Sequence, residues 1–240
     1  MDAGKSDPIA ALGEFFALPA ADPAGWRPIA SLCGDPAALH EYTKRTRAAT
    51  AAGFAIDEAE VPVKAAASSV HLSITARLLS PAIGAAVCSG RVPLLTMDSL
   101  FWQKDSSHRP ALGKAGVEWV AETDPRRVAA TIAESLIESV LRLLNDTMAL
   151  AESLSPQVMW GNIASAANGA VTVLAMSHPD AERRGRELVA ELIAIEPLRG
   201  TADVVGEQFR RRNCCLFYQV PGGGYCGDCV LTDGRARPDT

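Results

Sequence analysis

Aromatic residues are scarce in this 240-residue sequence, at 5%, and there is no excess of positive charge. Twenty-three basic residues against 28 acidic ones give a formal net charge of −5, and the sequence pI is near 5.4. Duplex nucleic acid and anionic membranes attract strongly basic surfaces, so this balance predicts no nucleic-acid partner and at most peripheral membrane contact. Histidine is also rare, with four residues, and no Ser-His-Asp or Cys-His set can be assembled from their spacing.

Long apolar runs of the membrane-spanning kind are missing too. The first residues, 1–7, show no apolar segment after a basic start, so we expect no secretory signal. The longest stretch without Asp, Glu, Lys or Arg is 153–179, but it contains Gln157, Asn162 and Asn168. Such amides are costly in hydrocarbon, and we therefore predict a buried helix of a cytoplasmic protein.

Helix formers dominate what is present. Alanine accounts for 41 residues, and hydrophobic and charged residues make up 48% and 21% of the chain, as in ordinary globular proteins. An Asp or Ser before a proline caps a helix start, and this pair occurs at Asp7-Pro8, Asp35-Pro36, Asp124-Pro125 and Ser155-Pro156.

The resulting helices can be given approximate bounds. One should run from Asp35 to Gly53, one over 65–88 with Pro81 kinking or breaking it after Ser80, and one over 180–195. Apolar residues spaced four apart predict another helix over 125–148.

A period of two over 117–122 instead predicts a strand, with residues 94–103 as its hairpin partner across a polar loop. The expected fold class is α+β, predominantly helical, with a small antiparallel β-hairpin or sheet at roughly residues 92–122 and a cysteine-rich C-terminal segment. We expect a single domain over 1–240, with a helical body over 60–205 and a cofactor-binding motif over 207–232.

Six cysteines are present, and four of them lie within 16 residues near the C-terminus. They are Cys214, Cys215, Cys226 and Cys229, with the spacing C-C-x10-C-x2-C. In a reducing compartment such a cluster indicates metal binding more than disulfide bridges. Thiolates suit both iron–sulfur clusters and zinc. Structural zinc sites typically use two pairs of ligands, and the two ligands of each pair are separated by a few residues in the sequence. The doublet without a gap favours iron–sulfur, and zinc or plain structural thiols remain as alternatives.

The residues around these cysteines resemble a known family. Arg211-Arg-Asn-Cys-Cys-Leu-Phe-Tyr and Gly223-Gly-Tyr-Cys-Gly-Asp-Cys-Val-Leu are similar to the C-terminal signature of FhuF-type ferric-siderophore reductases. Two weaker stretches, Ala76-Arg-Leu-Leu-Ser-Pro81 and Trp160-Gly-Asn162, extend the likeness over roughly residues 65–232, whereas the N-terminal 60 residues contribute nothing recognisable.

The resemblance implies a cofactor and an activity. The four C-terminal cysteines would all bind a 2Fe–2S cluster, and the protein would reduce ferric siderophore iron by one electron in the cytoplasm. A ferric siderophore of the hydroxamate type and a separate electron donor would be its partners. The alternative is a non-enzymatic protein that uses the same cysteines as a structural zinc site or an iron–sulfur sensor.

Substrate contacts are expected from residues near the motif or on the helix after Pro156. Arg212 and Arg211 could hold an anionic chelate, while Trp160, Asn162 and His71 are further candidates. Each has a simpler interpretation as well: a solvated basic turn for the arginines, and core packing for Trp160, Asn162 and His71.

Overall fold

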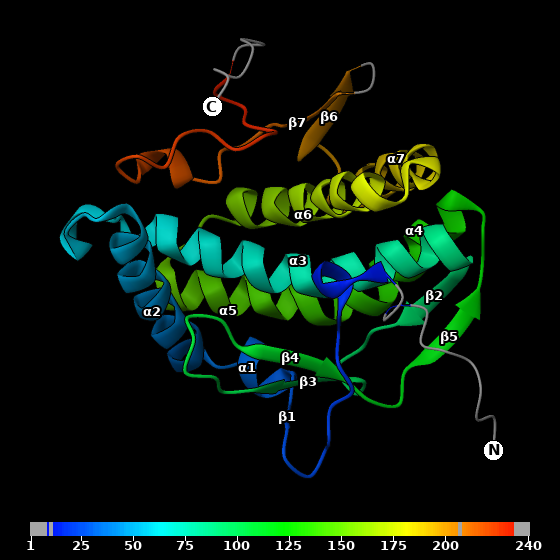
Figure 1. Ribbon diagram of the computed structural model, residues 1–240, viewed down its shortest axis with the longest axis horizontal. Helices are drawn as coiled ribbons and strands as arrows, with labels where there is room; N and C mark the ends of the chain where they lie inside the picture. The colour runs from blue at the N-terminus through cyan, green and yellow to red at the C-terminus, as the bar shows by residue number, and fades with distance from the viewer. Residues whose placement is uncertain (1–8, 10–11, 206–207, 233–240) are drawn as a thin grey trace.

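The computed structural model describes residue 9 and residues 12–205 and 208–232 of the chain. Most of these residues form helices, with short antiparallel strands between them (Figure 1). The helices are α1 Ala30–Cys33, α2 Pro36–Phe54, α3 Val63–Ser89, α4 Pro125–Ile132, α5 Arg142–Glu152, α6 Pro156–Ser177 and α7 Glu182–Ala194. The strands are β1 Arg27–Pro28, β2 Arg91–Leu94, β3 Leu100–Gln103, β4 Ala111–Lys114, β5 Glu118–Ala121, β6 Ala202–Val205 and β7 Gln208–Arg211. The α+β class is therefore confirmed.

Helix starts follow the capping pattern. The Asp35 carboxylate accepts hydrogen bonds from the N–H groups of Ala37 and Ala38, and Asp124 accepts one from Arg127. These bonds satisfy amides that the first helical turn leaves without partners. Ser155 makes no such bond, and Asp7-Pro8 lies outside the described residues. The predicted stop of α2 at Gly53 is slightly short, since Phe54 ends the helix and Ala55 takes the left-handed conformation with φ of 54°.

Pro81 does not break α3, so the break that was one of the two predicted outcomes is wrong. The helix runs unbroken from Val63 to Ser89 with Pro81 in its interior, where it is buried together with Ser80. A proline removes one helical hydrogen bond and crowds the preceding turn, but neighbouring packing can hold the helix together. Here α3 is the central helix and is packed on α2, α5 and α6.

The apolar spacing of four over 125–148 is confirmed as one helical stretch, but not as one α-helix. Its middle, Ala133–Leu141, is a π-helix between α4 and α5. Apolar side chains spaced four residues apart shift gradually around an α-helix, which has about 3.6 residues per turn. The wider turn of the π-helix keeps these side chains facing the core. Val128, Ile132, Leu136, Val140 and Leu144 are all nearly fully buried.

The predicted hairpin between residues 94–103 and 117–122 is wrong in its pairing. β3 pairs with β4, which lies inside the expected loop, and β1 completes a three-stranded sheet in the order β1-β3-β4. β5 pairs instead with β2 at Arg91–Leu94. All these pairs are antiparallel. Period-two patterning identifies a strand but does not identify its partner, which is why only the presence of β structure in 92–122 was predictable.

Two helices, α3 and α6, are long and apolar enough to cross a membrane by length and composition. About two thirds of the apolar window in α3 and 61% of that in α6 are buried inside the protein, as in the core helices of soluble proteins. The two helices pack against each other along their length. The predicted buried helix over 153–179 is thus α6.

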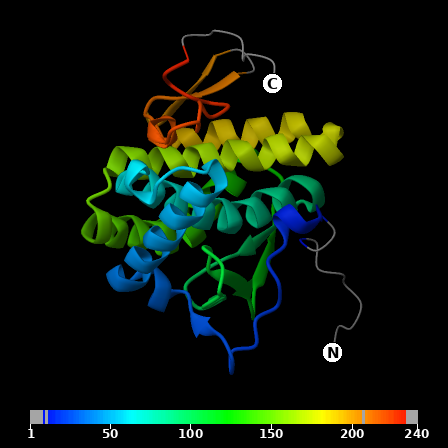
Figure 2. The ribbon, with the colours of Figure 1, turned by 60° about the vertical axis from the view of Figure 1, so that its left-hand side comes forward.

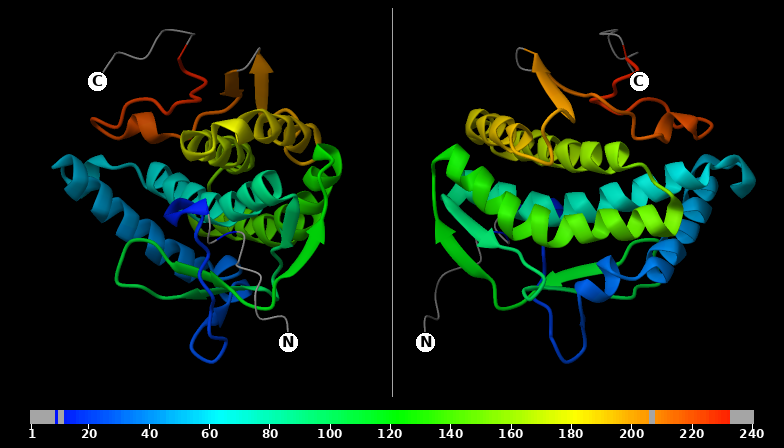
Figure 3. Two further views of the ribbon diagram at one scale, coloured as in Figure 1. Left: turned by 45° about the vertical axis from the view of Figure 1, so that its right-hand side comes forward. Right: turned by 180° about the vertical axis from the view of Figure 1, so that it is seen from behind.

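The C-terminal segment lies over α6 and beside the turn between α2 and α3. Figures 1, 2 and 3 show it in orange and red, on the opposite side of the helices from the β1-β3-β4 sheet. Contacts of β7 with α6, and of the short 3-10 helix η6 (Phe217–Gln219) with α3, confirm this placement. The segment that contains the four cysteines therefore packs on one side of the helical body.

Candidate metal centre

The cysteine segment turns back on itself after the β6–β7 hairpin. The N–H of Arg211 donates to the carbonyl of Asp228 at 3.1 Å, which ties the start of the segment to its end. Between them the N–H of Cys229 donates to the carbonyl of Cys226 at 3.2 Å, a tight turn within the C-x2-C pair. The glycines at 222–224 allow this reversal, because Gly222 and Gly224 adopt positive φ.

The fold brings one cysteine of the doublet to one cysteine of the C-x2-C pair. The Sγ atoms of Cys215 and Cys226 are 3.7 Å apart, and all six cysteines of the chain are free thiols. Two thiolates that bind one metal at ~2.3 Å with tetrahedral geometry are separated by ~3.8 Å. The Cys215–Cys226 pair therefore has the spacing of two sulfurs on a common ion.

Backbone N–H groups face the other two sulfurs. Leu216 donates to the Sγ of Cys214 at 3.2 Å, and Leu231 donates to the Sγ of Cys229 at 3.4 Å. Hydrogen bonds of this kind stabilise thiolates and tune iron–sulfur centres. The doublet is thus divided: Cys215 meets Cys226 and also has the Phe217 backbone as a partner, while Cys214 and Cys229 each have one amide partner.

Electrostatics favour negative charge within the Cys215–Cys226 pair. The hydrogen bond between the Cys215 and Cys226 thiols lowers the pKa of Cys215 to about 6, against burial, and the Arg211 charge lowers it further. The same bond raises the pKa of Cys226. Burial raises the pKa of Cys214, with added repulsion from Cys215 and Cys229. The nearby Asp228 carboxylate raises the pKa of both Cys215 and Cys226.

The four thiols of the segment supply enough ligands for a centre with two metal ions. Among the described residues, no group of three or more His, Cys, Asp or Glu side chains lies close enough to hold a single ion. A structural zinc site needs four ligands around one point. A 2Fe–2S cluster needs two thiolates at each iron, so one close pair and two further sulfurs in the same short segment fit it.

Arg211 is the basic residue that the fold places at these sulfurs. Its side chain is only 1% exposed, and its Nη2 donates to the Oδ1 of Asn162 at 2.8 Å. Its Nε and Nη1 have no hydrogen-bond partner among the described residues. Arg212, the other arginine expected at the chelate, is exposed and forms a bidentate pair with Asp203 at 2.8 and 2.6 Å.

A chain of buried polar side chains continues from Arg211 into the helical body. Asn162 on α6 donates to the Oγ of Ser68 at 3.0 Å and lies 3.4 Å from the Nδ1 of His71 on α3. The Nε2 of His71 is 2.7 Å from the Oδ1 of Asn145 on α5. With Asn162 donating to Nδ1, the His71 proton is on Nε2 and points to Asn145. Burial lowers the pKa of His71 to about 4, and the Arg211 charge lowers it too, so the ring is neutral at pH 7.

Gly161 explains how closely the segment approaches α6. A Cβ at this position would collide with the Oδ1 of Asn213 and would lie 3.1 Å from the Nη2 of Arg211. Trp160-Gly161-Asn162 therefore combines a site of close approach with the amide that receives Arg211. The indole of Trp160 is half-buried and has the Arg142 guanidinium 5.3 Å from its ring centroid.

The predicted substrate residues thus fall into two groups. Arg211, Asn162 and His71 have almost no exposed surface and take part in the polar chain. Arg212 and Trp160 retain exposure, and a role in substrate binding stays a prediction for them. Sequence reasoning missed Asn145 and Ser68, which complete the chain. The one available signal was Asn145 itself, an amide in the apolar stripe between Leu144 and Met148.

Comparison with known proteins agrees with this geometry. A search of curated proteins finds no match to the chain. Residues 211–231 match the family model described as the FhuF 2Fe-2S C-terminal domain, which spans all four cysteines. The two-metal donor set and the family match converge on one cofactor. Residues 211–231 are therefore similar to the C-terminal domain of FhuF proteins, and the cofactor of this segment is a 2Fe–2S cluster.

Proposed function

We propose that this protein is a cytoplasmic reductase that removes iron from ferric siderophores. The observation that carries the proposal is the 3.7 Å approach of Cys215 to Cys226 within the 2Fe–2S segment, because it joins the two halves of the motif at one metal position. When bound, the cluster would supply a single electron, the number that converts Fe(III) to Fe(II).

The four C-terminal cysteines would hold the cofactor in pairs. Cys215 and Cys226 would bind one iron, and Cys214 and Cys229 the other. The amides of Leu216 and Leu231 would stabilise the second pair of thiolates. Arg211 would offset part of the negative charge that four thiolates bring to a half-buried segment.

The chemistry of iron accounts for the release step. Fe(III) is held tightly by the hard anionic oxygens of a siderophore, whereas Fe(II) binds them much more weakly. One electron passed to the chelated iron therefore frees it, with no bond of the chelator broken. The electron would come from a separate donor, because the cluster must be reduced again after each electron that it passes on. A hydroxamate chelate is the proposed substrate.

The test uses a matched pair of cysteine variants. Cys226→Ser removes one sulfur of the close pair, whereas Cys88→Ser removes an exposed thiol at the end of α3, outside the motif. Anaerobically purified wild-type and Cys88→Ser protein should contain equal iron and acid-labile sulfide. After reduction with dithionite and removal of the excess, both should be reoxidised by a ferric trihydroxamate with release of Fe(II).

Cys226→Ser should lose the cluster spectrum or the Fe(II) release while keeping its helical circular dichroism. A zinc-loaded wild-type protein without sulfide would exclude the cofactor role. An intact, reducible cluster that no ferric chelate reoxidises would favour the sensor alternative and end the reductase proposal.

A further inference from the structure

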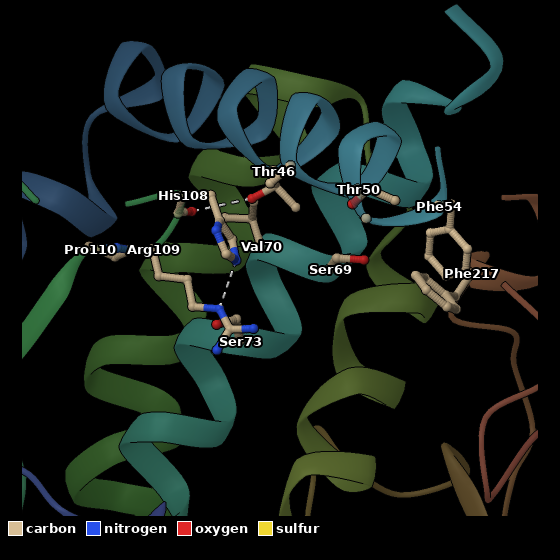
Figure 4. A pocket seen from close by; sticks show the side chains of 12 residues that line it. Thr46, Thr50, Phe54, Ser69, Val70, Ser73, His108, Arg109, Pro110 and Phe217 are labelled. Atoms are coloured by element: carbon tan, nitrogen blue, oxygen red, sulfur yellow. Dashed lines mark hydrogen bonds between the residues drawn. The ribbon is translucent and has the colours of Figure 1, made fainter. Parts of the chain in front are cut away.

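A cavity of about 310 Å³ lies next to the cysteine segment, between α2, α3 and the loop that joins β3 to β4 (Figure 4). Its size is at the lower end for ligand sites, so a siderophore would enter it with one face. Its lining combines hydroxyl, aromatic and loop residues, among them Thr50, Ser73, Phe54, Phe217, His108 and Arg109.

The loop wall of the cavity is held in place by three side chains from the helices. Arg77 on α3 donates to the carbonyl of Pro110 at 2.5 Å. On α2, Thr46 donates to the carbonyl of His108 at 3.3 Å and Arg45 to that of Asp105 at 2.8 Å. Arg77 belongs to the stretch Ala76–Pro81 that resembled the reductase family, and this bond gives it a structural role at the cavity. The wall is therefore a built feature of the fold.

The opposite end of the cavity is formed by the cysteine segment itself. Phe217 lines the cavity and packs against Phe54 of α2, with the ring centroids 6.1 Å apart. Figure 4 shows these two rings at one end and His108 and Arg109 at the other. Phe217 follows Cys215 by two residues, so the two Cα atoms are at most ~7.6 Å apart. A molecule in the cavity lies beside the cofactor-binding segment.

The charge of the lining discriminates between kinds of chelate. Among the described lining residues, Arg109 carries the only formal charge at neutral pH. Burial and the neighbouring Arg109 lower the pKa of His108, which keeps its ring neutral. The hydroxyls of Thr50 and Ser73 can donate hydrogen bonds to chelate oxygens, and the phenylalanines can cover aliphatic links. Such a lining suits an uncharged ferric complex and leaves a triply negative one with too little positive charge.

We propose that this cavity, rather than the outer face of the cysteine segment, is where the ferric chelate binds. The proposal rests on the reductase function proposed above. In the bound state the chelate contacts Phe217 with its apolar part and receives hydrogen bonds from the hydroxyls of α2 and α3. Its iron then takes one electron, becomes Fe(II) and leaves, while the chelator departs intact.

The test separates binding from reduction by using gallium(III), which has the charge and size of Fe(III) but is not reduced. The probe is the gallium complex of a cyclic trihydroxamate, added to oxidised holoprotein and followed by calorimetry. Thr50→Trp fills the cavity from α2, and Ala52→Trp places the same side chain at an exposed position of the same helix. Ser73→Leu on α3 is a second, smaller block in the case that Thr50→Trp does not fold.

Wild-type and Ala52→Trp protein should bind the gallium complex with the same Kd, and the two cavity variants should bind it at least tenfold more weakly with an unchanged cluster spectrum. The gallium complex of a tricatecholate should bind wild-type protein at least tenfold more weakly than the trihydroxamate. Undiminished binding by folded Thr50→Trp and Ser73→Leu would overturn the location, even where reduction of the ferric complex is normal. A different result would reject the reductase function and keep the site: the variants abolish gallium binding, but the wild-type protein does not reduce the ferric complex.

Discussion

Arg211 connects the cofactor segment with the helical body, because it lies near the cysteines and bonds to a residue of α6. It is buried, it donates to Asn162 on α6, and two of its nitrogens have no partner among the described residues. A buried guanidinium is costly unless it is compensated, and the Cys214 and Cys215 sulfurs are close enough for the Arg211 charge to lower their pKa. The sequence presents three arginines in a row, and only the fold decides which of them serves the site.

The first prediction concerns the charge of Arg211. Arg211→Gln should shift the midpoint potential of the cluster to a more negative value, because reduction adds negative charge that the guanidinium would otherwise stabilise. Spectroelectrochemical titration of the visible spectrum measures this shift. Arg212→Gln is the matched control and should leave the potential near that of the wild type, since its guanidinium is exposed and paired with Asp203. Equal potentials for Arg211→Gln and wild type would contradict a tuning role.

The second prediction concerns His71. Its pKa is lowered from 6.5 to about 4 in the folded protein, so the unfolded chain binds the proton more tightly. Folding keeps the His71 ring neutral. Its contribution to the free energy of unfolding is therefore fully present above pH 6.5 and is lost as the pH falls toward 4. Between pH 7.5 and 5.5 the loss from this residue should be about 1 kcal/mol.

Urea unfolding of the holoprotein at these two pH values measures that loss. His71→Gln should unfold with less dependence on pH than the wild type. An identical pH dependence of the two proteins would show that His71 is not buried as a neutral ring.

At the scale of elements, the junction of the cysteine segment with α6 is decided by the absence of a side chain at Gly161. Alanine normally stabilises a helix interior relative to glycine by about 0.5–1 kcal/mol. At Gly161 the added Cβ would instead meet Asn213 and Arg211. This position is one where local helix preference and tertiary packing conflict.

The third prediction follows from that conflict. Gly161→Ala should destabilise the protein by about 1–3 kcal/mol through overpacking and should lower the cluster content. Gly169→Ala, on the same helix with nothing within 4 Å of its added Cβ, should be neutral or stabilising. Thermal unfolding and iron analysis of the two variants provide the comparison. A Gly161→Ala protein as stable and as iron-rich as Gly169→Ala would mean that the segment does not dock here.

At the scale of the whole molecule, the helical body and the cysteine segment have different sources of stability. The body contains one large apolar core that joins all the long helices. The segment contributes Val220 to a small separate cluster with Ala51, Val61, Ala65 and Ala66. Phe209 and Leu216 pack only at the edge of the main core, and the Arg211–Asn162 bond and the hydrogen bonds to sulfur add a few polar contacts. Bound metal should therefore be the main constraint on the segment.

The fourth prediction is a regional response to loss of the cluster. Anaerobic removal of iron with a chelator should increase amide hydrogen exchange in residues 208–232 and leave α3 and α6 protected. Hydrogen-exchange mass spectrometry of the holo and apo forms measures this. Exchange that rises throughout the helical body would indicate instead that the cluster is needed for the entire fold.

The sequence by itself determined the features that depend on neighbouring residues: the helix starts at Asp35 and Asp124, the buried stripe over 125–148, and the four cysteines in one segment. Their physical causes are local, in capping, periodicity and ligand spacing. The tertiary structure alone decided that Pro81 stays inside a helix, that β3 pairs with β4, and that Arg211 rather than Arg212 faces the sulfurs. It also decided that Asn162 and His71 are core residues in one polar chain, because each of these outcomes depends on which distant side chain packs or bonds at that position, and no local pattern specifies it.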